Sequence, residues 1–203
     1  DQNPDTYKGQ FWATGSADNG GVHTNSGVQN HWFFLLSDGG NGKNDKNDTF
    51  SVAGLGIDMA AAIAFRSLRY YLVETSNYSD ARLGSIQAAE DLYGICSTPV
   101  TETAKAWYAV GVGPEEIGSD LRMLQITGPS TFVCGLSDSE PISVQFRYNG
   151  CTGELQAGSQ IPLSYQIDGG TTVLDTLTLN TALAAGDTVN YTFSLPTDVF
   201  AKP

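Results

Sequence analysis

Apolar positions in the first half of the chain recur every three to four residues, whereas those in the second half alternate with polar positions. The first pattern is typical of helices that bury one apolar stripe. It predicts helices over about residues 26–37, 58–73, 79–94 and 97–110, with a short strand over 49–53. These elements predict an all-α domain over residues 1–113.

Residues with known capping preferences stand at the ends of two of these helices. Gly94 follows the third helix, where glycine commonly terminates a helix. Ser97 and Pro99 lie at the start of the fourth helix, as an N-cap and a first-turn proline. The boundary between these two helices is therefore expected near residues 94–97.

Alternating apolar residues in the second half of the chain predict strands. The alternation covers residues 142–148, 161–167, 173–179 and 189–195, and Leu121 opens the region. Turn-forming residues separate these stretches, so an immunoglobulin-like β-sandwich is expected over residues 121–203. About five strands are expected where such a sandwich usually has about seven, so a module truncated at Pro203 is one option.

A composition change separates the two halves. Residues 112–120 read VGPEEIGSD, which combines proline, glycine and two adjacent glutamates. We interpret residues 114–120 as a linker. In a linker, Glu115 and Glu116 are solvated charges rather than acid/base catalysts.

The charge of the chain excludes two classes of partner. The 203 residues carry a formal net charge of −12 and contain only ten Lys and Arg residues. Phosphate backbones and anionic lipid surfaces attract basic proteins, so neither nucleic acid nor a membrane is expected as partner. No apolar run approaches the roughly 20 residues of a transmembrane helix. The acidity is typical of a secreted protein.

The three cysteines do not have the spacing of a zinc site. A disulfide between Cys134 and Cys151 would leave Cys96 unpaired. The strand predicted between Cys134 and Cys151 could instead hold their Cα atoms beyond the roughly 7 Å limit for a disulfide. Both alternatives stay open.

Candidate chemistry is concentrated in residues 18–27, DNGGVHTNSG. Asp18 precedes His23, and two glycines between them allow a turn with positive φ. A carboxylate that accepts from one imidazole nitrogen fixes the tautomer and favours the protonated ring. The other nitrogen can then donate to the oxyanion of an acyl-transfer transition state. A structural hydrogen bond is the plainer interpretation of the same pair.

Four further segments follow this motif in order along the chain. They are VQNHWFFLL (28–36), VAGLGIDMAAAIAFRSLRYYL (52–72), SNYSDARLGSIQAAEDLYG (76–94) and AWYAVGVG (106–113). Together with DNGGVHTNSG, these segments resemble the C-terminal lobe of the thermolysin-like zinc metalloproteases over about residues 3–113. The resemblance implies that His23 hydrogen-bonds the tetrahedral intermediate of peptide hydrolysis and that Asp18 orients it.

The family's zinc site is absent from this sequence. That family binds zinc through H-E-x-x-H on a helix of its N-terminal lobe, plus a further glutamate. Here the only histidines are His23 and His31, and neither is followed by glutamate. The resemblance therefore implies a zinc endopeptidase whose N-terminal lobe, carrying the metal, is the partner of this chain. The start at Asp1 without Met or a signal segment favours a fragment or processed product over a degenerate relative.

Two other features are interpreted as structural. His31 lies within the first predicted helix, where a surface or packing role is expected. Residues 38–48, DGGNGKNDKND, offer oxygen ligands for calcium but lack the frame of a calcium-binding loop, so a solvated loop is favoured.

Two classes of function remain. One is the C-terminal half of a secreted endopeptidase that acts on peptides or proteins. The alternative is a non-catalytic binding or spacer module, in which the β-domain acts and the helical lobe supports it. The β-domain resembles modules appended to secreted bacterial proteases and adhesins. Its aromatic residues fall on the apolar faces of their strands, which favours a core over a binding platform.

Overall fold

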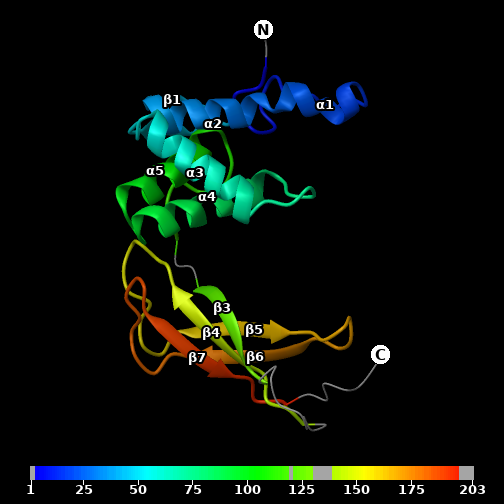
Figure 1. Ribbon diagram of the computed structural model, residues 1–203, viewed down its shortest axis with the longest axis vertical. Coiled ribbons are helices and arrows are strands. Elements are labelled where there is room, and N and C mark those ends of the chain that lie inside the picture. The colour runs from blue at the N-terminus through cyan, green and yellow to red at the C-terminus, as the bar shows by residue number, and fades with distance from the viewer. Residues whose placement is uncertain (1–2, 119–120, 130–138, 197–203) are drawn as a thin grey trace. The chain divides into compact units, whose positions relative to one another are not determined.

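The computed structural model describes residues 3–118, 121–129 and 139–196. By its internal contacts the chain divides into two units, Asp1–Ile117 and Gly118–Pro203 (Figure 1). The division falls inside residues 114–120, whose role as a linker stays a prediction, as do the limits of the two domains.

Unit 1 contains the four helices predicted from the apolar spacing. Its elements are α1 (Asp18–Asn25), α2 (Gly27–Asp38), β1 (Gly40–Lys43), β2 (Thr49–Val52), α3 (Ile57–Tyr70), α4 (Tyr78–Tyr93) and α5 (Thr98–Ala109). The helices α2 to α5 and the strand β2 match the predicted stretches. The predicted helical domain is confirmed. The prediction missed only α1 and β1, and β1 joins β2 in one small hairpin.

The hairpin arises inside the stretch interpreted as a solvated loop. β1 has the sequence GNGK, which has little strand propensity, but it pairs antiparallel with β2 from Gly40↔Val52 to Lys43↔Thr49. The Asn44 side chain then orders the turn, because its Oδ1 accepts the backbone N–H groups of Lys46 and Asp48 at 3.0 Å each. Pairing with β2, which a local pattern does not show, therefore converts this loop into a strand.

Local sequence explains the helix ends. Asn77 and Asp80 form a capping box at the start of α4, where the Asn77 side chain accepts two backbone N–H groups and Asp80 accepts that of Asn77. Gly94 ends the same helix with φ of 87°, as its position predicted. Pro99 lies in the first turn of α5, although the Ser97 side chain makes no capping bond.

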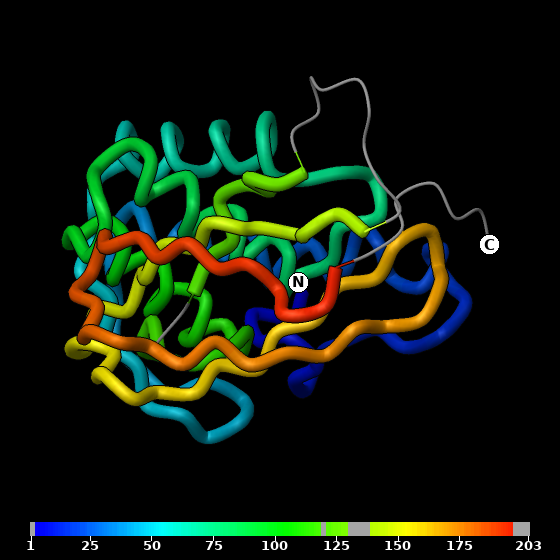
Figure 2. Tube along the Cα trace, turned by 90° about the horizontal axis from the view of Figure 1, so that it is seen from below, coloured from blue at the N-terminus to red at the C-terminus, as the bar shows by residue number. Residues whose placement is uncertain are grey.

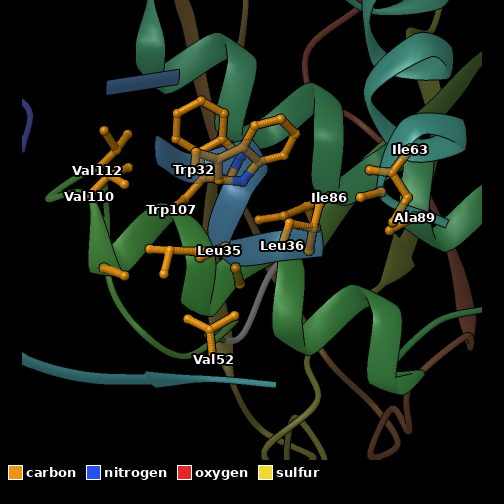
Figure 3. Close-up of a cluster of buried hydrophobic side chains, with 14 of the residues drawn as sticks. Trp32, Leu35, Leu36, Val52, Ile63, Ile86, Ala89, Trp107, Val110 and Val112 are labelled. Atoms are coloured by element: carbon orange, nitrogen blue, oxygen red, sulfur yellow. The ribbon is translucent and has the colours of Figure 1, made fainter. Parts of the chain in front are cut away.

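The core of unit 1 is built around two stacked tryptophans (Figure 3). Trp32 of α2 and Trp107 of α5 lie with ring centroids 4.7 Å apart and planes inclined by 21°. The Trp107 indole N–H donates to Ser85 Oγ at 2.7 Å, which satisfies this buried polar group. Aliphatic residues of α2, β2, α3, α4 and the segment after α5 belong to the same cluster, including Leu35, Leu36, Val52, Ile63, Ile86, Ala89, Val110 and Val112.

Unit 2 consists of five described strands in two antiparallel sheets. They are β3 (Leu121–Gly128), β4 (Ser143–Tyr148), β5 (Gln160–Tyr165), β6 (Val173–Thr178) and β7 (Thr188–Thr192). The order is β3-β4-β7 in one sheet and β5-β6 in the other, and Figure 2 shows β5 and β6 side by side as a hairpin. Tyr148 of the first sheet and Leu177 of the second share one apolar cluster. The predicted strands are confirmed, and two facing sheets fit the immunoglobulin-like resemblance.

The structure contradicts the alternative in which Cys134 bonds Cys151 and leaves Cys96 unpaired. Cys96, the residue left unpaired if Cys134 bonds Cys151, is disulfide-bonded, as is Cys151. Cys134 lies outside the described residues. Among residues 3–118, 121–129 and 139–196, no helix is long and apolar enough to cross a lipid bilayer.

Asp175 on β6 ties the segment after β7 to the β5–β6 sheet. Its Oδ2 accepts the Ser194 backbone N–H at 2.7 Å and its Oδ1 accepts that of Thr176 at 2.8 Å. These bonds, with a smaller effect of the Tyr191 hydroxyl, lower the pKa of Asp175 from 3.8 to about 2.

Because this pKa is lowered on folding, the carboxylate stabilises unit 2 fully above its unfolded pKa of 3.8. The contribution is lost as pH falls from 3.8 through about 2. In Asp175→Asn, we expect the unfolding free energy to depend less on pH over this interval than in the unmodified chain. Urea unfolding at a series of pH values measures this dependence. Asp168→Asn, in the turn between β5 and β6, is the matched control. Parallel pH profiles for Asp175→Asn and the unmodified chain would contradict the role.

Candidate active site

The motif DNGGVHTNSG forms helix α1, at the end of unit 1 opposite the β1–β2 hairpin (Figure 1). The first half of α1 is left-handed: φ is 54° at Asp18, 49° at Asn19, 84° at Gly20 and 83° at Gly21. Glycine adopts such angles readily, so the adjacent glycines allow the chain to reverse before the helical turn that carries His23. The turn with positive φ is confirmed, although it continues into a helix that was not predicted.

This turn places Asp18 against His23. The imidazole Nδ1 lies 2.5 Å from Asp18 Oδ1, and the His23 backbone N–H donates to Asp18 Oδ2 at 2.9 Å. Thr24 adds a backbone N–H to the same Oδ2 at 3.1 Å and its hydroxyl at 3.4 Å. Because an ionised carboxylate only accepts, Nδ1 carries the proton in this contact.

Hydrogen bonding keeps Asp18 ionised. The pKa of its carboxyl is lowered, first by the bond from the His23 ring and then by the Thr24 backbone N–H. A charged Asp18 in turn holds the ring in one orientation and leaves Nε2 as the outward nitrogen.

The His23 ring is open to solvent. Its side chain is 86% exposed, against 29% for that of Asp18. Within the described residues Nε2 has no hydrogen-bond partner. Such a ring, fixed at one nitrogen and free at the other, can hydrogen-bond a group that approaches from outside the chain.

Three residues that sequence reasoning did not single out support the pair. Thr24 bonds Asp18 directly, Asn25 holds the turn in place, and the Tyr78 hydroxyl donates to the backbone oxygen of Asn25 at 2.7 Å. Thr24 and Asn25 were visible only as members of the motif. No sequence signal identified Tyr78, which lies 53 residues away from Asn25.

His31 and Trp12 pack against neighbouring residues of the lobe. His31 is half-buried, with Nδ1 3.1 Å from the backbone oxygen of Asp5 and its ring stacked on Phe34 at 6.3 Å. This is the packing role expected for it. Trp12 packs against Tyr7, with ring centroids 5.0 Å apart.

The described residues do not fit a zinc site. Among them no group of three or more His, Cys, Asp or Glu side chains could hold a metal ion. The oxygen-rich residues 44–48 make hydrogen bonds to the protein instead, as the Asn44 side chain does.

Comparison with known proteins gives a family for unit 1. The family model described as the thermolysin metallopeptidase, alpha-helical domain, matches residues 1–112. The chain is 47% identical over 109 residues to a bacillolysin of Bacillus caldolyticus and to a thermolysin of Alicyclobacillus acidocaldarius. It is 40% identical over 109 residues to a bacillolysin of Brevibacillus brevis.

These matches cover 54% of this chain and 19% of each of the three relatives. The chain thus spans about a fifth of the length of the curated relatives that it matches. The remainder of the chain, which forms the β-rich unit 2, lies outside the family match. Through residues 1–112, the chain belongs to the thermolysin metallopeptidase family, whose α-helical domain it carries.

Proposed function

We propose that this chain is the C-terminal half of a secreted zinc endopeptidase, in which His23 stabilises the transition state and Asp18 orients His23. The observation that carries the proposal is the His23 ring, 86% exposed and bonded through Nδ1 to Asp18 at 2.5 Å. Membership of a metallopeptidase family supports the reaction class.

The geometry suits an oxyanion donor. When water adds to the carbonyl carbon of a peptide bond, negative charge collects on the carbonyl oxygen. The Nδ1 proton of His23 is committed to Asp18, so Nε2 carries a proton only when the ring is an imidazolium. The Asp18 carboxylate lies 2.5 Å from Nδ1 and holds the ring with Nε2 facing outward. Donation from Nε2 would then offset the charge that develops on the oxygen.

We assign the zinc ion and the other catalytic residues to an N-terminal lobe of the complete protease. Since the described residues lack a metal-ligand set, the zinc ligands are placed on an N-terminal lobe of the complete protease. That lobe and this chain would share one active site, with His23 on this side of the substrate.

This division predicts that residues 1–203 alone have no peptidase activity and do not retain zinc stoichiometrically. A fluorogenic peptide assay and metal analysis after gel filtration check both points. The complete protease, inhibited by a chelator, is the positive control. Chelator-sensitive peptidase activity from the purified chain alone would contradict the division.

The alternative is a spacer or binding module on a lobe without catalytic function. In unit 2 the Tyr165 ring packs against Phe193 at 4.8 Å, and Phe193 is buried beside Tyr191. Aromatic residues held in a core do not form a binding platform, which favours the spacer form of this alternative. Kinetics of a His23 variant of the complete protease separate it from the catalytic proposal.

A further inference from the structure

The Asn25 side chain is buried and hydrogen-bonds both the left-handed turn and the segment before it. Only 6% of Asn25 is exposed. Its Oδ1 accepts the Ala13 backbone N–H at 2.9 Å, and its Nδ2 donates to the Ala13 backbone oxygen at 3.0 Å and to that of Gly20 at 3.3 Å. One buried amide thus joins the segment before the turn, the turn itself and the end of α1.

The Asn25 amide packs so closely against the turn that no side chain fits at Gly21. A Cβ atom added at Gly21 would lie 2.7 Å from Asn25 Nδ2 and 2.7 Å from the Ala13 Cβ. The glycine is therefore required by its φ of 83° and by its packing against Asn25. The turn that contacts Asn25 in this way is the one that brings Asp18 back to His23.

A second contact fixes Asn25 to the body of the lobe. The Tyr78 hydroxyl, at the start of α4, donates to the Asn25 backbone oxygen at 2.7 Å. The Tyr78 ring packs against Tyr7, Trp12 and Trp107. Through Tyr78 the position of α1 is tied to the aromatic core of unit 1.

We infer that Asn25 is a positioning residue that holds the Asp18 carboxylate against the His23 ring, with Tyr78 anchoring it to α4. Its catalytic consequence rests on the function proposed above. The structural part does not, because the contact between Asp18 and His23 is a property of this chain alone. Asn25 touches neither the His23 ring nor, in the proposed reaction, the substrate.

The first test is spectroscopic and uses the 203-residue chain. Nitrogen-15 NMR of the histidine rings reports the tautomer of His23, and His31 is an internal reference because the chain has only two histidines. We expect Asn25→Ala to lower the Nδ1–H tautomer fraction of His23 and leave His31 unchanged. The backbone amides of His23 and Thr24, which donate to Asp18, should exchange about tenfold faster.

Three further variants guard against general unfolding. Asn25→Asp keeps the shape and the acceptor but removes the donors to Ala13 and Gly20. Tyr78→Phe removes only the hydroxyl that donates to Asn25. Both variants should lower the Nδ1–H tautomer fraction of His23, by less than Asn25→Ala does. Asn30→Ala, on the exposed side of α2, is the matched control and should change nothing.

The second test uses kinetics of the complete protease. Asn25→Ala should lower kcat by about tenfold or more with little change in KM, and the loss should nearly vanish when His23 is already alanine. Such non-additivity is expected only if Asn25 acts through His23. A fully additive double variant would overturn the inference.

The two tests separate the inference from the proposed function. An unchanged His23 tautomer in folded Asn25→Ala and Asn25→Asp chains overturns the positioning role, whatever His23 does in catalysis. A shifted tautomer with no kinetic effect of His23→Ala supports the positioning role and removes the catalytic assignment.

Discussion

Replacing His23 with alanine in the complete protease is expected to lower kcat by about 10²–10³ and to leave KM nearly unchanged. The reason is that the bond from Nε2 forms to charge that develops only in the transition state. The ring is also largely exposed, at 86%, so its removal leaves no cavity in the core of the lobe. Steady-state kinetics with a peptide substrate measure both constants.

His31→Ala is the matched control for this experiment. His31 lies on α2 of the same lobe, and its Nδ1 lies 3.1 Å from the backbone oxygen of Asp5. It should leave kcat within about twofold of the unmodified protease, since no contact joins it to Asp18 or His23. Equal kinetics for His23→Ala and the unmodified enzyme would remove the catalytic role and favour the spacer alternative.

Replacing Trp107 with alanine is expected to lower the unfolding free energy of unit 1 by about 3–5 kcal/mol. Trp107 has no exposed surface and stacks on Trp32 at 4.7 Å. Its loss would leave a large cavity among residues that close packing prevents from collapsing fully. The Ser85 hydroxyl would also lose the indole N–H that it accepts.

Urea unfolding followed by tryptophan fluorescence measures this effect. All three tryptophans lie in unit 1, and Trp12 and Trp32 remain as reporters in the variant. Phe65→Ala is the control, because this aromatic side chain of α3 is 65% exposed and should cost much less. A loss below about 1 kcal/mol for Trp107→Ala would show that the stacked pair is not central to the core.

Patterns within short stretches of the sequence determined most of the secondary structure. Helices α2 to α5 carry their own apolar stripes and end residues such as Gly94, and these act over a few positions only. Alternation predicted four of the five described strands of unit 2, β4 to β7, in the same way. The motif that holds Asp18 and His23 was also readable, because its residues are neighbours along the chain.

What only the tertiary structure decided depends on contacts between distant segments. Strand β1 forms because β2 offers it a partner, despite its poor propensity. The end of α1 is held by Tyr78, 53 residues further along the chain, and the turn by a buried Asn25 amide that reaches back to Ala13.

The sequence by itself therefore determined that Asp18 and His23 form a pair. The tertiary structure decided that the Nδ1 side of the ring meets the carboxylate while the rest of it faces solvent. The physical reason is that the turn is held by hydrogen bonds of Asn25 to residues 12 and 53 positions away. Such bonds leave no periodic pattern in the sequence, whereas propensity, capping and amphipathic spacing do.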